Sequence, residues 1–335
     1  MNERMHARTV PRDVQTDTLP MQKVASILDI SRIGRFTITS PLTERTHSVL
    51  FRATSIDGAP VVAKVSRKGL AAAEDERDHS PLLISHESDV HTAVAKIKNP
   101  HLLGLVDAGR ESIKVVNGRR VDIDEYPYLV TELAEGTLLD KVERDGPLNA
   151  SDAARILGEL ADGVGALHDQ GIRHRDIKVS NIYMVGDQPK IGDFGSAVKG
   201  RETTALGGGS IGYMAPEINK TGVDPDLKDR VDIFSLGAVA AELFSGKQVL
   251  RTDTLDTYEK IFDPETYSAA LDRRLSVLPA PLQDPIGNAL ALNPENRPAT
   301  PDALVADIED ALRRLPKAAV LYHRPSSAAI RSHFI

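Results

Sequence analysis

The chain has 335 residues, a formal net charge of −7 and no cysteine. The acidic balance argues against nucleic acid as the main partner, because phosphate backbones attract basic surfaces. The absence of cysteine excludes disulfides, thiolate catalysis and cysteine-based metal sites. Apolar residues make up 41% of the chain, enough for a sizeable core, but no run of eighteen of them occurs. The sequence therefore predicts no membrane span and a cytosolic location.

The first part of the chain is typical of a small sheet with one helix. Short β-branched stretches between turn residues predict strands, and apolar residues at helical spacing predict helices. Asp57-Gly58 is a strong hairpin signal, and Asn117-Gly118 is expected to turn a second hairpin. After a disordered stretch 1–20, the expected elements are a short helix 21–33, strands 35–39, 48–55 and 60–65, a loop 67–80, a helix 85–98 and a hairpin 103–133.

From Gly136 onward the apolar spacing becomes helical. The clearest helix is 149–170, which has one apolar face and is expected to be capped by Gly171. Further helices are predicted over 231–244, 281–292 and 301–315. The chain then divides into an N-terminal extension 1–33, a smaller unit 34–134, a larger unit 135–316 and a tail 317–335.

Two acids, an amide and an amine follow the helix 149–170. They lie in His174-Arg175-Asp176-Ile177-Lys178-Val179-Ser180-Asn181 and in Asp193-Phe194-Gly195. Asp176 can accept a proton from an attacking hydroxyl, and Asn181 and Asp193 offer hard oxygen ligands that suit Mg²⁺. Lys178 can neutralise a transferring phosphate, and phosphoryl transfer depends mainly on such positioning and neutralisation. This order of residues resembles the catalytic loop and metal loop of eukaryotic-type Ser/Thr protein kinases.

Other strings occur in the order of the kinase motifs, over about residues 60–298. They are Val61-Val62-Ala63-Lys64-Val65, which reads as a strand with an internal lysine, Ala215-Pro216-Glu217, Asp232-Ile233-Phe234-Ser235-Leu236-Gly237 and Asn293-Pro294-Glu295-Asn296-Arg297-Pro298. The resemblance implies a two-lobed α+β protein-kinase fold, with 34–134 as the small lobe and 135–316 as the large lobe. It also implies ATP and Mg²⁺ as cofactors and a protein as the substrate. The sequence carries no signal for an oligomeric state.

The resemblance implies an ATP site between the lobes. Lys64 would contact the α- and β-phosphates and pair with a helix acid, for which Glu87 is preferred to Asp89 because its side chain reaches further. Taken alone, Lys64 would more often be a solvent-facing strand lysine, and the downstream motifs reverse that preference. Thr131 would limit access to the pocket behind adenine. The implied ATP-binding residues are Lys64, Glu87, Val49, Ala63, Thr131, Glu132, Leu133 and Ala134, with Asn181 and Asp193 on magnesium and Asp176 and Lys178 as catalytic residues.

Three further residues have structural roles in the kinase pattern. Asp232 is expected to anchor the backbone of the catalytic loop. Glu217 and Arg297 are expected to form a buried ion pair, which fixes geometry more reliably than it adds stability.

Arg175, before the catalytic acid, implies a regulated activation segment. In kinases with this arginine, a phosphate on the segment often orders the loop. Thr203 and Thr204 are the candidates for that phosphate, and Ser210 is expected to shape the substrate-docking loop. The alternative is an unmodified, polar, mobile loop.

The loop that should cover the phosphates departs from the family pattern. The expected Gly-x-Gly-x-x-Gly window is Leu42-Thr43-Glu44-Arg45-Thr46-His47, which contains no glycine. Bare backbone can approach phosphates closely, whereas here Arg45 or His47 could meet phosphate by charge. Two interpretations follow: a mobile loop over weakly bound but reactive nucleotide, or a pseudokinase that serves as a scaffold. The first is favoured because the metal ligands and the proton acceptor are all present.

A small-molecule phosphotransferase is a third interpretation. Such enzymes share the lobes and a similar acid–amide–acid order. They would lack both the segment between Asp193 and Glu217 and the lysine two residues after the acid. Both features are present here, so this interpretation ranks below the other two.

Overall fold

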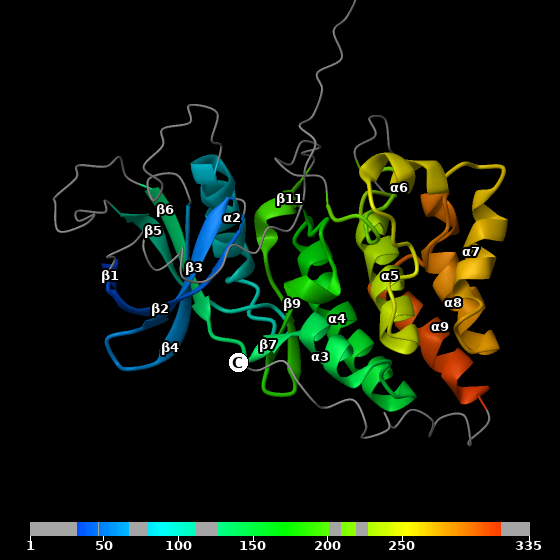
Figure 1. Cartoon of the computed structure of the whole chain (residues 1–335), viewed down its shortest axis with the longest axis horizontal. Helices are drawn as coiled ribbons and strands as arrows, with labels where there is room; N and C mark the ends of the chain where they lie inside the picture. Colours follow the sequence, from blue (N-terminus) through cyan, green and yellow to red (C-terminus); the bar gives the residue numbers. More distant parts are fainter. Residues whose placement is uncertain are drawn as a thin grey trace, which may run out of the picture.

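The computed structural model describes residues 32–45, 47–66, 80–111, 126–200, 209–218 and 227–315. A sheet lobe lies on the left of Figure 1 and a mostly helical lobe on the right, so the predicted two-lobed α+β fold is confirmed. The elements are β1 (Arg32–Ile33), β2 (Phe36–Glu44), β3 (Ser48–Thr54), β4 (Pro60–Ser66), α2 (Ser80–Val94), β5 (Leu105–Glu111), β6 (Tyr126–Glu132), β7 (Gly136–Thr137), α3 (Leu138–Asp145), α4 (Ala150–Asp169), β8 (Ile172–Arg173), β9 (Ile182–Val185), β10 (Gln188–Ile191), β11 (Val198–Lys199), α5 (Arg230–Ser245), α6 (Leu255–Ile261), α7 (Tyr267–Leu275), α8 (Ala280–Ala289) and α9 (Pro301–Arg313).

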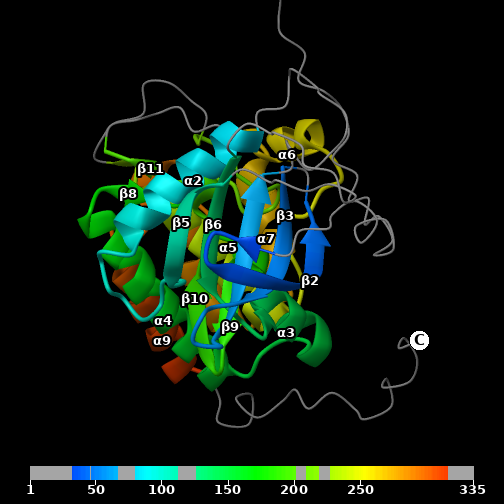
Figure 2. The same ribbon diagram turned by 90° about the vertical axis from the view of Figure 1, so that its left-hand side faces the viewer.

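The sheet lobe, which faces the viewer in Figure 2, is an antiparallel sheet in the order β1-β2-β3-β4-β6-β5. Successive side chains of a strand point to opposite faces. Alternate residues of β3 and β4 therefore build one core, which comprises Val49, Phe51, Ala53, Val61, Ala63 and Val65 together with Ile33, Phe36, Tyr128 and Val130. The other face of β4 carries Lys64 toward α2.

The start of the described chain differs from the prediction. Arg32 and Ile33 were expected to end a helix, but they form β1. The side chain of Ile33 is fully buried, and Ile33 pairs with Phe36 across a turn in which Gly34 has a φ of 53°. Burial against the sheet core thus outweighs the helical spacing seen in the sequence.

The hairpin between β2 and β3 is tighter than predicted. β2 was expected to end at residue 39 but continues to Glu44, which pairs with Val49. The turn is closed by the backbone N–H of Arg45, which donates to the carbonyl of Ser48 at 2.8 Å. Because no glycine interrupts the pairing, strand structure extends into the window that was expected to be a loop.

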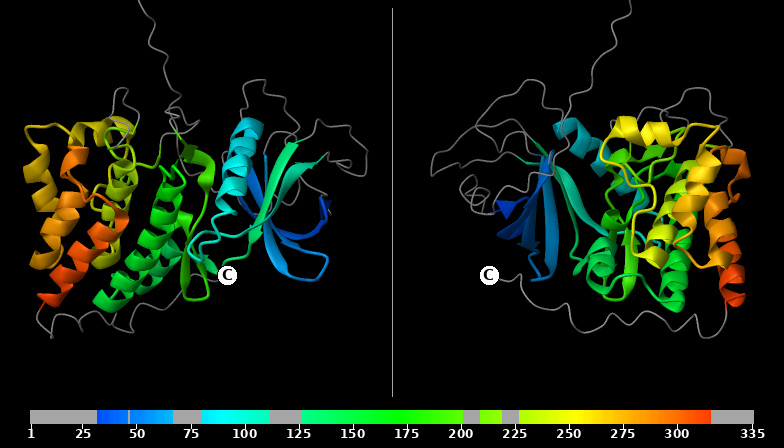
Figure 3. Two further views of the ribbon diagram at one scale, coloured as in Figure 1. Left: turned by 180° about the vertical axis from the view of Figure 1, so that it is seen from behind. Right: turned by 45° about the vertical axis from the view of Figure 1, so that its right-hand side comes forward.

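Helix α2 stands between the sheet and the large lobe (Figure 3). It runs from Ser80 to Val94, earlier than the predicted 85–98, and the chain beyond it turns through Lys98 at a φ of 55°. Val90 and Val94 belong to the core of the large lobe, whereas Glu87 reaches Lys64 of β4. A single helix therefore contacts both lobes.

The large lobe follows the prediction in its main helices. The side chain of Asn149 accepts from the backbone N–H of Asp152 at 2.9 Å and so caps α4. Gly171, with a φ of 64°, follows the end of α4 as expected. The predicted helices 231–244, 281–292 and 301–315 correspond to α5, α8 and α9, with ends within three residues of the expected ones.

Several short elements were not predicted. Helices α3, α6 and α7 and strands β7 to β11 are too short for a period to be read from the sequence. For α3 a different signal exists, since Thr137 and Asp140 form a capping box in which the side chain of each accepts from the backbone N–H of the other.

Some predictions lie outside the described residues. They are the disordered stretch 1–20, most of the helix 21–33, the loop 67–80 up to Ser80, the turn Asn117-Gly118, the sites Thr203 and Thr204, and the tail 317–335. The lobe limits 34–134 and 135–316 stay predictions. Within the part of the chain that the structure describes, every helix is too short or too polar to cross a membrane.

The ion pair expected between Glu217 and Arg297 is present. The two guanidinium nitrogens lie 2.5 and 2.9 Å from the two carboxylate oxygens, and the side chains are 6% and 0% exposed, respectively. The guanidinium also lies over the ring of Phe234, 5.0 Å from its centroid. The pair thereby ties the segment after the metal loop to the chain that leads into α9.

Replacing Arg297 by alanine should leave the Glu217 carboxylate buried without its partner. We expect the free energy of unfolding, measured by urea denaturation, to fall by roughly 3–5 kcal/mol. The matched control is Lys260→Ala, which removes one member of the exposed pair with Asp256 and should cause little measurable loss. Equal effects of the two substitutions would contradict the structural role of the buried pair.

Candidate active site

The catalytic loop is held by one buried carboxylate from α5. Asp232 accepts the backbone N–H of His174 at 2.9 Å and that of Arg175 at 2.8 Å, and it lies 2.9 Å from Nε2 of His168. Burial alone would raise the pKa of Asp232, but these bonds, led by the one from His168, outweigh burial and lower it. Arg175 has a φ of 65°, so the carboxylate fixes a backbone conformation that L-residues rarely adopt.

Asp176 is oriented by two neighbours and keeps one oxygen free of them. The amide nitrogen of Asn181 donates to Oδ2 and to the main-chain oxygen of Asp176, both at 2.9 Å. The ammonium of Lys178 lies 3.0 Å from the same Oδ2. Oδ1 is buried and has no hydrogen-bond partner among the described residues. A buried acceptor without a donor is costly, so Oδ1 suits an incoming hydroxyl.

Ser210 lies beside the same lysine. Its hydroxyl oxygen accepts a hydrogen bond from the ammonium of Lys178 at 2.5 Å. Lys178 therefore bridges Asp176 to the segment that precedes Ala215. This contact attaches the expected substrate-docking segment to the catalytic loop.

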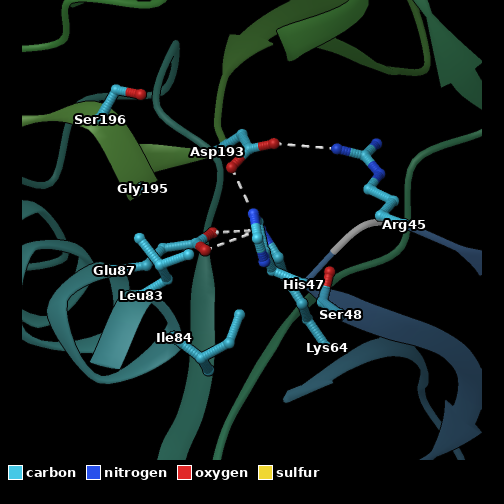
Figure 4. Close-up of a pocket in the computed structure, with 10 residues that line it drawn as sticks. All are labelled: Arg45, His47, Ser48, Lys64, Leu83, Ile84, Glu87, Asp193, Gly195 and Ser196. Carbon is cyan, nitrogen blue, oxygen red and sulfur yellow. Dashed lines mark hydrogen bonds and ion pairs between the residues drawn. The ribbon is translucent and has the colours of Figure 1, made fainter. Parts of the chain in front are cut away.

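Asp193 and three other charged side chains meet in the cleft, each from a different part of the chain (Figure 4). The ammonium of Lys64 lies 2.7 Å from Glu87 and 3.1 Å from Oδ1 of Asp193. The guanidinium of Arg45 lies 2.9 Å from Oδ2 of Asp193. The preference for Glu87 over Asp89 is thus supported, whereas the Arg45 contact was not predicted. The four residues share a cavity of about 290 Å³ with neighbours that include His47 and Ser196.

The group contains two cations and two anions, and these opposite charges shift one another's pKa values. Burial would raise the pKa of Asp193, but Lys64 and then Arg45 outweigh burial and hold it well below its usual value. Burial raises the pKa of Glu87 in spite of Lys64. Burial would lower the pKa of Lys64, yet Asp193 and Glu87 raise it. The lysine therefore stays charged.

The donor set fits a hard divalent cation. The bonds that Asn181 makes to Asp176 use its amide nitrogen, which leaves the amide oxygen as a possible metal ligand. Across the described ranges no group of three or more His, Asp or Glu side chains could hold a metal ion by itself. Two protein ligands suit Mg²⁺, which commonly completes its coordination with phosphate oxygens and water.

A protein kinase domain matches residues 48–307 of the chain. The chain belongs to the protein kinase family. The resemblance to eukaryotic-type Ser/Thr protein kinases is thereby confirmed.

Curated relatives of this kinase carry Ser/Thr kinase names. Serine/threonine-protein kinase PknL of Mycobacterium tuberculosis is 31% identical over 227 residues, which cover 65% of this chain and 52% of the relative. The probable kinase PknB of Bifidobacterium longum is 29% identical over 75% of this chain and 36% of its own. The probable kinase PkwA of Thermomonospora curvata is 28% identical over 82% and 34%, respectively. This chain thus matches between a third and about half of each relative.

Two of the predicted ATP contacts in this kinase are wrong. Val49 and Ala63 are buried in the sheet-lobe core, on the face opposite to Lys64. Because side chains alternate, the direct neighbour of Lys64 cannot share its face. Leu50 pairs directly with Lys64, and Val62 lies two residues before it, so these two occupy the Lys64 face. The prediction of Val49 and Ala63 was therefore one residue out of phase in both strands.

The remaining predicted contacts lie at the end of β6. Thr131 is 7% exposed and pairs with Val62, on the same face as Lys64. The side chain of Glu132 accepts from the backbone N–H of Gly104 at 2.6 Å and pairs with Lys190 at 2.8 Å. Leu133 and Ala134 follow the last residue of β6, beyond the strand. Their backbone groups are therefore placed where the chain crosses between lobes.

Phe194 of the metal loop packs between two histidine rings. The ring of His91 from α2 lies 4.7 Å from it, and that of His174 lies 5.2 Å away, centroid to centroid. Nε2 of His91 is 2.7 Å from the carbonyl of Leu103 and donates to it, while Nδ1 is buried without a partner in the described part of the kinase. Burial lowers the pKa of His91 to about 4. No pattern in the sequence predicts this contact of His91 with Phe194.

The neutral His91 should make stability depend on pH. Its pKa is lowered in the folded kinase, so between pH 6.5 and 4 the unfolded chain binds more protons. Stability should therefore fall as the pH falls, by roughly 3 kcal/mol from this residue. We expect His91→Leu to flatten the dependence of unfolding free energy on pH in that range. The control His47→Leu, at an exposed histidine, should leave the slope unchanged. An unaltered slope in His91→Leu would show that His91 does not resist protonation.

Proposed function

We propose that this kinase transfers the γ-phosphoryl group of ATP to a serine or threonine of a protein substrate. The observation that carries the proposal is the free, buried Oδ1 of Asp176, beside an oxygen of the same carboxylate that is held by Asn181 and Lys178. Such an oxygen suits a general base that accepts the proton of an attacking hydroxyl.

Each charged residue of the cleft has a role in this reaction. Asp176 orients the substrate hydroxyl and takes its proton, while Lys178 offsets charge on the group being transferred. Lys64, held by Glu87 at 2.7 Å, binds the α- and β-phosphates. Mg²⁺, held by Asn181 and Asp193, would neutralise charge on the phosphate oxygens.

The adenine would lie against the Lys64 face of the sheet. Leu50 and Val62 supply apolar contact there in place of Val49 and Ala63. Backbone groups of Glu132, Leu133 and Ala134 bond the adenine edge, and Thr131 closes the inner end of the pocket. Ser210 and the Ser/Thr kinase names of the relatives support a hydroxyl of serine or threonine as the acceptor. A cytosolic location stays a prediction.

Asp176→Asn should remove most phosphate transfer and leave nucleotide binding intact. The amide can still accept from Lys178 but cannot take the proton of a hydroxyl, so turnover should fall by roughly 10²–10⁴-fold. Transfer of radiolabelled phosphate to a generic Ser/Thr substrate measures the loss, and stabilisation by Mg·ATP in a thermal-shift titration measures binding. Asp187→Asn makes the same charge change at an exposed turn and should leave both readouts unchanged.

The same two measurements separate the alternatives. Binding of Mg·ATP without transfer by the unaltered kinase would favour a scaffold. Transfer to small hydroxyl compounds but not to protein would favour a small-molecule phosphotransferase. Full activity of Asp176→Asn would falsify the proposed role of the acid.

We also expect phosphate on the activation segment. One guanidinium nitrogen of Arg175, Nη1, is buried without a partner among the described residues, while Nη2 donates to the carbonyl of Ile218. Such a spare donor suits a phosphate on Thr203 or Thr204. Mass spectrometry after incubation with Mg·ATP should find phosphate between Ser196 and Ser210 in the active kinase but not in Asp176→Asn. An unmodified segment in an active sample would contradict the expectation.

A further inference from the structure

The glycine-free hairpin sends a charged side chain onto the metal ligand. Arg45 lies at the end of β2, where its backbone N–H closes the turn onto Ser48. Its guanidinium reaches across the cleft to Oδ2 of Asp193 at 2.9 Å, while Lys64 holds Oδ1 at 3.1 Å. Figure 4 shows the two cations approaching Asp193 from separate directions. Both oxygens of this carboxylate are thus bonded to positive groups.

This arrangement opposes metal binding at Asp193. A guanidinium has only donors, so it cannot share the oxygen by accepting from a hydrated ion. Its positive charge also repels a divalent cation at the distances of a shared ligand. A metal ion that takes Oδ2 of Asp193 therefore has to displace Arg45.

The side chain of Arg45 is placed so that it can leave. It is 40% exposed, whereas those of Lys64 and Glu87 are 13% and 5% exposed. Open cavity space lies beside it, toward His47 and Ser48. Arginine binds phosphate through parallel N–H bonds at least as well as it binds carboxylate. A triphosphate in the cleft therefore offers Arg45 an alternative partner.

We propose that Arg45 covers Asp193 in the nucleotide-free kinase and moves to the phosphates when nucleotide binds, so that nucleotide binding exposes the metal ligand. This proposal rests on the proposed ATP site and extends it. The arginine then serves two purposes in the hairpin: it supplies the phosphate contact that glycines no longer allow, and it holds off metal until nucleotide is present. The result is a coupling between the two ligands.

The test measures each ligand alone, without turnover. Mn²⁺ binding to the nucleotide-free kinase is followed by electron paramagnetic resonance, and ATP binding in EDTA by isothermal titration calorimetry. Arg45→Gln should bind Mn²⁺ about tenfold more tightly and metal-free ATP about tenfold more weakly than the unaltered kinase. Arg273→Gln is the matched control, since it removes an exposed arginine from α7 of the large lobe, outside the cleft, and should change neither affinity beyond twofold.

The outcomes separate this proposal from the proposed activity. If Arg45→Gln leaves both affinities as they are, or if Arg273→Gln shifts them equally, Arg45 has no special role, even where the kinase transfers phosphate. If the two affinities shift in opposite directions as stated but no phosphate is transferred, the coupling stands and the catalytic proposal fails. Circular dichroism of each variant confirms that the comparison is made between folded proteins.

Discussion

The geometry of the catalytic loop depends on one carboxylate that never meets substrate. Asp232 is fully buried in α5 and holds two successive backbone N–H groups of the loop. Those bonds offset the cost of the left-handed Arg175 and set the direction in which the chain presents Asp176. Because α5 is packed within the core of the large lobe, the anchor moves only if that core moves. Rigid support of this kind is what phosphoryl transfer by positioning needs.

The cleft around Asp193 is held together by ion pairs between side chains, whereas the catalytic loop is held by bonds to its backbone. Two cations and two anions form a chain of ion pairs, in which Lys64 contacts Glu87 and Asp193, and Asp193 contacts Arg45. Buried charges are stable only when paired in this way. A metal-bound nucleotide carries both negative phosphates and a positive ion. Phosphate can therefore pair with the cations of the group and the metal with its anions, so that no charge is left unpaired. The hairpin without glycine thus brings a charged side chain, Arg45, into the cleft.

The sequence predicted what is encoded by short strings and missed what depends on register or on long-range packing. Asp232, the Glu217–Arg297 pair and the partner of Lys64 were found because fixed spacings place them in known elements. Val49 and Ala63 were misplaced because a strand read one residue out of phase reverses every side chain.

Elements with little local signal were also missed or misplaced. The two-residue strands β7, β8 and β11 pair with strands that are not their neighbours in the chain. Arg45 and Asp193 are 148 positions apart in the sequence, so no local pattern predicts their contact. His91 was overlooked because a histidine at an apolar helical position gives no sign of the ring that it will face.

Helix α2 has a consequence for how the molecule folds. By sequence it belongs with the strands, yet Val90 and Val94 are part of the core beneath Phe194 in the large lobe. A fragment that stopped at the lobe boundary would expose these side chains to water and leave the helix half-covered. The strand-rich half is therefore not a self-sufficient foldon: its helix is completed by residues synthesised later, and the two halves should gain their final order together.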